Sequence, residues 1–198
     1  MRTTMFRRPT RTQAGQAGFT LIEFLLVLAL AAVVAGVAFL AFNNANSGAQ
    51  VYGAVRDVGI IQANIKNAFP NQQYAGLSTS TANEAHVFPA DMNANSFTAA
   101  QLITERWPGS TVSLLGCTPG TGTGTGTCTT GTYTLTINGV PPQACAQFVS
   151  QAGQNMSNAS VGTTAPGTSV FASGTLQPSL VASACAGTSP LTVVFTGS

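Results

Sequence analysis

Charged side chains are scarce in this chain, and their scarcity limits what it can bind. Asp, Glu, Lys and Arg make up only 6% of the 198 residues, against about 25% in an ordinary soluble domain. The formal net charge of +2 is misleading, because four of the seven basic residues lie in the first 18 positions: Arg2, Arg7, Arg8 and Arg11. From residue 19 onward three basic residues face five acidic ones. No basic patch remains there, so we predict no clear nucleic-acid site.

Groups that could bind a metal or perform catalysis are also few. His86 is the single histidine, and neither a second histidine nor a cysteine pair at metal-ligand spacing accompanies it. A hydrolytic triad would have to use His86, yet the chain has no nucleophile-elbow motif. The glycines spaced through residues 120–126 lack the βαβ unit that surrounds a phosphate-binding loop. The sequence therefore predicts no enzyme, no metal site and no cofactor.

Four cysteines all lie in the second half of the chain: Cys117, Cys128, Cys145 and Cys185. An even number of cysteines in an exported domain predicts two disulfides, and four cysteines permit three pairings. Cys117 and Cys128 flank the Gly-Thr repeat at 120–126, where a bridge would close the base of a flexible hairpin tip. We therefore expect Cys117 to pair with Cys128, which leaves Cys145 for Cys185.

Residues 19–42 form a long apolar run, interrupted only by Thr20, Glu23 and Gly36. As a helix, rising about 1.5 Å per residue, the run is long enough to cross a hydrocarbon core of about 30 Å. Four arginines precede it, and the next basic residue is Arg56. The positive-inside rule then predicts a single membrane span with the N-terminus in the cytoplasm.

Two simpler interpretations of this run are a secretory signal peptide and a plain membrane anchor. The run is longer than the apolar region of a typical signal peptide, and no clear small-x-small cleavage site ends it. Neither interpretation explains Glu23, because a carboxylate inside a spanning helix costs up to about 3 kcal/mol. We therefore interpret Glu23 as a functional residue.

Residues 18–23 read Gly-Phe-Thr-Leu-Ile-Glu. Gly18, Phe19 and Glu23, followed by the long uncharged helix, resemble the class III signal of type IV pilin precursors, the substrates of prepilin peptidase. The resemblance implies cleavage between Gly18 and Phe19 and N-methylation of the new terminus, which becomes a methylphenylalanine. It also implies that 1–18 is a leader peptide and that 19–42 is the transmembrane and assembly helix.

The resemblance further implies how the subunits assemble. Cleavage exposes an ammonium group at Phe19, which in a filament can pair with Glu23 of a neighbouring copy and offset the cost of burying both charges. Burial of apolar helix surface supplies most of the cohesion. The implied partners are further copies of the chain, prepilin peptidase, the pilus assembly machinery of the inner membrane and, before assembly, membrane lipid. The implied location is the bacterial inner membrane, and after assembly the cell-surface pilus.

A second helical segment follows the apolar run. Apolar residues recur there at helical spacing, namely Val51, Val55, Val58, Ile61 and Ile65. We expect one helix from about residue 20 to residue 68, weakened at 48–53 and stopped before Pro70. Its second half, residues 43–69, is amphipathic and should pack one face on a globular domain.

Residues 70–198 are rich in Thr, Ser, Gly and Asn and form the expected exported domain. Short helices are predicted near 82–86, 96–102 and 142–149, and strands at 111–115, 132–137, 169–172 and 191–195. Arg106, Trp107 and Pro108 are interpreted as an edge of the core, and Glu84 and Asp91 as solvated or capping residues. Antiparallel strands beside a long helix predict an α+β fold, the arrangement that the pilin resemblance also implies.

Three further stretches, at 74–77, 87–92 and 140–145, resemble the type IVb (PilS-like) branch of the pilin family. A bridge from Cys145 to Cys185 would be similar to the disulfide that bounds the variable C-terminal region of these proteins. The leading interpretation is a structural subunit of a type IV pilus. The alternatives are a minor pilin or type II secretion pseudopilin, a membrane-anchored adhesin that never polymerises, and a secreted enzyme.

Overall fold

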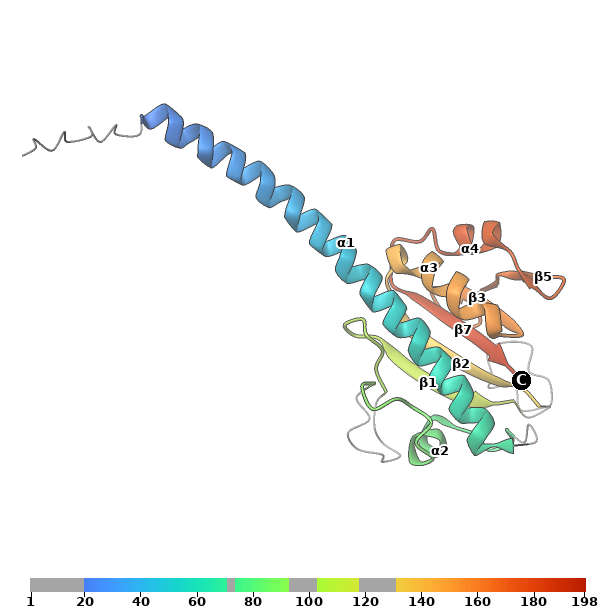
Figure 1. The fold of residues 1–198 in the computed structure, drawn as a ribbon. Coiled ribbons are helices and arrows are strands. Elements are labelled where there is room, and N and C mark those ends of the chain that lie inside the picture. Colours follow the sequence, from blue (N-terminus) through green and yellow to red (C-terminus); the bar gives the residue numbers. More distant parts are fainter. Residues whose placement is uncertain (1–19, 71–73, 93–102, 118–130) are drawn as a thin grey trace, which may run out of the picture. The chain divides into compact units, whose positions relative to one another are not determined.

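The computed structural model describes residues 20–70, 74–92, 103–117 and 131–198 (Figure 1). Two compact units make up the chain, residues 1–43 and residues 44–198. Helix α1 (Leu21–Ala68) contributes to both of them. Residues 18 and 19, the Gly-Thr repeat, Cys128 and the helix expected at 96–102 lie outside the described residues.

In the first unit, the described residues form the apolar part of α1. Leucine and alanine dominate this stretch, and both are strong helix formers. Every side chain from residue 20 to residue 42 is exposed, among them Leu21, Phe24 and Phe42. The helix is long and apolar enough to cross a membrane.

In the second unit, α1 continues as an amphipathic helix. One face is buried in the domain core through residues spaced three or four apart: Val51, Ala54, Val58, Ile61 and Ile65. This spacing follows from the 3.6-residue turn, which places these side chains on one stripe. The helix is continuous through 48–53, where we expected a weakening, and it ends at Ala68, two residues before Pro70.

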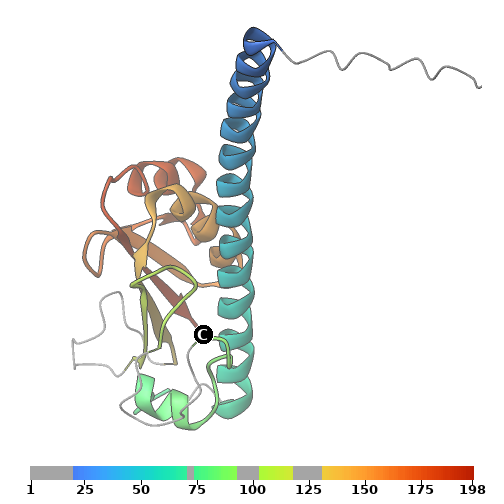
Figure 2. The same cartoon turned by 90° about the vertical axis from the view of Figure 1, so that its left-hand side faces the viewer.

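The described part of the second unit contains a five-stranded antiparallel sheet in the order β1-β2-β7-β3-β4. Its strands are β1 (Thr111–Gly116), β2 (Tyr133–Val140), β3 (Asn158–Gly162), β4 (Thr168–Ser169) and β7 (Leu191–Gly197). The strand register aligns Leu114, Leu135, Phe195 and Ala159 in one row across the sheet. All four are at most 1% exposed. In Figure 2 the second half of α1 lies along one face of the sheet.

Helix α3 (Pro142–Ala152) completes the core beside β7. Proline at its first turn fits a position where the backbone N–H has no helical partner. Phe148 is fully buried between Trp107 and Phe195, with edge-on ring contacts at 5.2 and 5.6 Å between centroids. Cys145 forms a disulfide with Cys185, whose Cα atom lies 5.7 Å away. The bridge therefore ties α3 to the end of α4 (Pro178–Ala184).

The smaller elements show where local sequence signals were incomplete. Helix α2 (Thr79–Glu84) starts earlier than the predicted 82–86, because Ser78 and Thr81 form a reciprocal capping box at its start. The strand predicted at 169–172 is divided between two sheets: Ser169 pairs with β3, whereas β5 (Phe171–Ala172) pairs with β6 (Thr175–Leu176). The buried Val170 lies between Ser169, which pairs in the first sheet, and Phe171, which pairs in the second.

Candidate functional site

Glu23 lies in the first turn of α1. Its backbone N–H donates to the carbonyl oxygen of Thr20 at 3.0 Å and also approaches the Thr20 hydroxyl at 3.4 Å. A carboxylate in this position is stabilised by the positive end of the helix dipole. Its side chain is exposed, and its neighbours along the helix are apolar. Because Gly18 and Phe19 lie outside the described residues, the cleavage site itself stays a sequence prediction.

The apolar surface that surrounds Glu23 along α1 is continuous. Its large side chains are at least half exposed, from Leu21 (78%) to Phe42 (68%). Soluble monomers rarely expose a contiguous apolar surface of this kind. Lipid or another protein chain must therefore cover it, and Glu23 is the single ionisable group that such a cover would have to accommodate within residues 20–42.

A charge cluster lies in the second unit and comprises Arg56, Asp57, Asp91, Glu105 and Arg106. Asp57 is fully buried, and its two oxygens accept from Arg56 Nη2 at 3.1 Å and from Arg106 Nε at 2.8 Å. Asp91 accepts from Arg56 Nη2 at 2.8 Å and from Nη2 of Arg106. The two guanidinium groups thus join α1 to two segments that are remote in sequence. Asp91, which we expected to be solvated or a capping residue, is an ion-pair partner.

Glu105 is a buried member of the charge cluster, 7% exposed, and it forms no ion pair within the described part of the chain. One of its oxygens, Oε1, accepts from the backbone N–H of Arg106 at 3.3 Å, and Oε2 has no hydrogen-bond partner among the described residues. Burial and, next, the negative charge of Asp57 raise the pKa of Glu105 to about 8. At Asp91, partial burial also acts to raise the pKa, but the hydrogen bond and positive charge of the Arg106 guanidinium outweigh it, so the pKa of Asp91 is lowered.

Gly53 makes room for the charge cluster on the surface of α1. A Cβ atom at this position would lie 2.2 Å from Nε of Arg106 and 2.4 Å from its Cδ. The Arg106 side chain therefore crosses the helix toward Asp57 through the space that a Cβ atom of residue 53 would occupy. Gly59, two turns further along, has nothing within 4 Å of the equivalent position.

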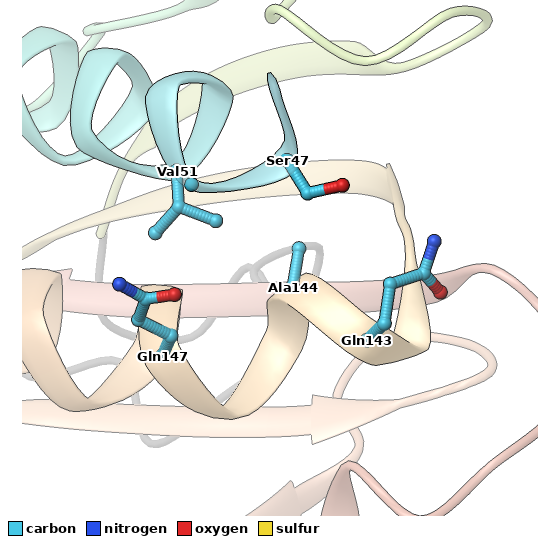
Figure 3. Close-up of a pocket in the computed structure, with 6 residues that line it drawn as sticks. Ser47, Val51, Gln143, Ala144 and Gln147 are labelled. Carbon is cyan, nitrogen blue, oxygen red and sulfur yellow. The ribbon is translucent and has the colours of Figure 1, made fainter. Parts of the chain in front are cut away.

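A shallow hollow of about 240 Å³ lies between α1 and α3 (Figure 3). Ser47, Gly48 and Val51 line it from the first helix, and Gln143, Ala144 and Gln147 line it from the second. The lining offers hydroxyl and amide groups but no titratable side chain. Among the described residues, no group of three acidic, histidine or cysteine side chains is placed to hold a metal ion.

The disulfide between Cys145 and Cys185 is present as expected. Cys128 lies outside the described residues, so its pairing with Cys117 stays a prediction. The charge cluster was not predicted from the sequence, although one signal for it was present. Asp57 lies three residues after Ala54 and four before Ile61, so the helical period places it on the buried face of α1.

Comparisons with known proteins give matches at both ends of the chain. A family model described as "PilS N terminal" matches residues 49–198, and a model described as "Prokaryotic N-terminal methylation motif" matches residues 13–39. Among solved structures, the chain is similar to TcpA, a type IV pilin from Vibrio cholerae El Tor biotype, with a TM-score of 0.50 and 14% identity. That match covers 75% of this chain and 99% of the other. No curated protein matches.

Proposed function

The chain belongs to the PilS family and is a structural subunit of a type IV pilus rather than an enzyme, and from this premise we propose how its own residues act in processing and assembly. Prepilin peptidase removes residues 1–18 and methylates the amino group of Phe19. The mature chain then joins a surface filament in which Glu23 binds the N-terminal ammonium group of a neighbouring copy.

One observation carries this proposal: an exposed apolar helix that contains a single carboxylate near its start. Burying one large apolar side chain contributes about 1.5–3 kcal/mol. Packing several such helices together therefore supplies ample free energy for association. A lone carboxylate works against this packing unless it has a partner of opposite charge. The ammonium group that cleavage creates at Phe19 is such a partner, and every copy brings one.

Removal of the leader also changes how the chain is held in the membrane. The four leader arginines favour a cytoplasmic N-terminus before cleavage. After cleavage the cytoplasmic end retains one ammonium group, which the carboxylate of a neighbour can neutralise. Loss of the arginines therefore lowers the cost of moving the helix from lipid into a bundle of identical helices.

The substitution Glu23→Gln tests the assembly role, because it removes the charge and keeps the size of the side chain. We expect Glu23→Gln and Glu23→Ala to abolish surface filaments while membrane insertion and processing continue, since the ammonium group would lose its buried partner. Filaments sheared from cells and protein in membrane fractions are the two quantities to measure. Glu84→Gln, which alters an exposed carboxylate of α2, is the matched control and should assemble normally.

The mass and N-terminal sequence of the mature protein test the processing step. A chain that begins at methylated Phe19 supports the proposal, whereas a chain that begins near Ala49 would show that the apolar run is a signal peptide. Normal filaments from both Glu23 variants would contradict the pairing even if processing occurs as expected. The amount of the protein in sheared filaments also separates a major subunit from a minor one.

A further inference from the structure

The charge cluster holds three separate parts of the domain together. Arg56 and Asp57 come from α1, Asp91 from the turn that precedes residue 93, and Glu105 and Arg106 from the segment that leads into β1. A hydrogen bond from Thr104 N–H to the carbonyl oxygen of Met92, at 3.4 Å, links the latter two parts directly. We propose that the charge cluster is a pH-sensitive clasp, which holds residues 89–92 and 103–110 against α1 while Glu105 is protonated and releases them when Glu105 ionises.

The charges of the cluster balance only with Glu105 neutral. Two guanidinium groups then face two carboxylates, Asp57 and Asp91, and each carboxylate contacts both arginines. The groups that face Glu105 are Asp57 from α1, Asp91 from the preceding turn and Arg106 beside it in the chain. An ionised Glu105 would add a third negative charge with no additional cation to match it.

Rearrangement of Arg106 cannot restore the balance. Its guanidinium group is bound to Asp57 and Asp91, and its contact with Glu105 is made through the backbone N–H. If the guanidinium group moved to Glu105, Asp57 would lose one of its two cations while it is fully buried. In either arrangement one buried carboxylate has too few cations beside it to balance its charge. Such a carboxylate is costly, so the clasp opens and exposes it to water.

Opening is possible from one side of the cluster. A hollow of about 390 Å³, lined by Ala49, Gln50, Asp91 and Arg106, brings solvent to its outer edge. The Arg106 side chain is 31% exposed and that of Asp91 is 45% exposed, whereas Glu105 is buried and does not line the hollow. Movement of residues 89–92 and 103–110 away from α1 would extend this hollow to Glu105 and hydrate its carboxylate.

Trp107 reports on such a movement because it follows Arg106 directly. It is the single tryptophan of the chain, it is 3% exposed, and its ring contacts that of Phe148. Release of residues 103–110 would expose the indole ring to water and shift its fluorescence emission to longer wavelength. The helices and the sheet would stay folded, so far-UV circular dichroism should not change in the same range.

The test is a titration of the full chain in detergent micelles from pH 6 to pH 9.5, followed by Trp107 fluorescence and circular dichroism. We expect a reversible red shift as the pH rises toward about 8, the pKa of Glu105 in the closed clasp, because opening of the clasp is linked to loss of the Glu105 proton. Glu105→Gln cannot ionise and should show no shift. Glu84→Gln makes the same chemical change outside the clasp and should titrate as the unmodified chain does.

A second substitution tests the charge argument without altering Glu105. Asp91→Asn removes one of the two negative neighbours of Glu105 from a partly exposed position, so the two arginines then balance Asp57 and an ionised Glu105, and the red shift should become smaller or disappear. A constant Trp107 emission across the range in the unmodified chain would overturn the proposal. A shift that persists in Glu105→Gln, or one that coincides with loss of circular dichroism, would overturn it as well.

Discussion

Residues 20–106 and residues 107–198 differ completely in charge. Every charged side chain that follows the leader lies between Glu23 and Arg106, and from Trp107 to Ser198 there is no Asp, Glu, Lys, Arg or His. The described part of the charged region is held by ion pairs and by the apolar face of α1. The described part of the uncharged region is held by strand pairing, by buried aromatic contacts and by a disulfide. Different perturbations should therefore act on the two regions.

The largest effect is expected in the uncharged region, on removal of the disulfide. The double substitution Cys145→Ser and Cys185→Ser should lower the free energy of unfolding by about 4 kcal/mol, since the bridge closes a loop with a sequence separation of 40. Denaturant unfolding of the full chain in micelles measures the loss.

The same substitution tests whether the two regions are independent. Because the bridge lies in a region without charges, its removal should lower the free energy of unfolding by the same amount at pH 6 and at pH 7.5. This loss should also add to the change in the free energy of unfolding caused by Glu105→Gln, within about 0.5 kcal/mol. A loss that changes with pH would show that the bridge and the charge cluster are coupled.

An intermediate effect is expected in the charged region from Gly53→Ala. Alanine favours the helix over glycine by about 1 kcal/mol, but its Cβ would displace the Arg106 side chain. The buried Asp57 would then lose one of its ion pairs, at a cost of about 3 kcal/mol or more. The net result should be a destabilisation of about 2 kcal/mol, measured by thermal unfolding.

Gly59→Ala is the matched control in the same helix. Its new Cβ would meet nothing within 4 Å, so only the propensity term applies and the variant should be more stable by about 1 kcal/mol. Equal and favourable effects at the two glycines would show that the contact between Gly53 and Arg106 contributes no stability.

The sequence predicted what depends on local periodicity and failed where remote parts meet. The long helix, the strands near 111–116, 133–140 and 191–197 and the helix at 142–152 follow from spacing and turn residues. Strand β3 has only two buried side chains, Ala159 and Val161, and its place is determined by pairing with β7. Helix α4 has seven residues, too few for a clear apolar period.

Among the candidate functional residues, the sequence predicted Glu23 but not the charge cluster. Glu23 was found because a charge in an apolar run is conspicuous even without a structure. The charge cluster was missed, although Asp57 lies on the buried face of its helix. The partner that explains this burial, Arg106, is 49 positions away in the chain, and no local pattern connects the two residues.

The two regions should also differ in how their stability depends on pH. The pKa of Glu105 is raised to about 8 in the folded protein from an ordinary value of 4.5, so the folded state retains a proton that the unfolded state releases. The contribution of this group is complete below about pH 4.5 and is lost as the pH rises through about 8. Between these limits the free energy of unfolding should fall by up to about 1.4 kcal/mol per pH unit.

Glu105→Gln should flatten this slope in denaturant unfolding at pH 5, 6 and 7, while the disulfide variant should keep it. If Glu105→Gln kept the slope of the unmodified chain, the pH dependence would come from groups outside the charge cluster. If the free energy of unfolding of the unmodified chain rose with pH instead, Glu105 would be ionised in the folded protein.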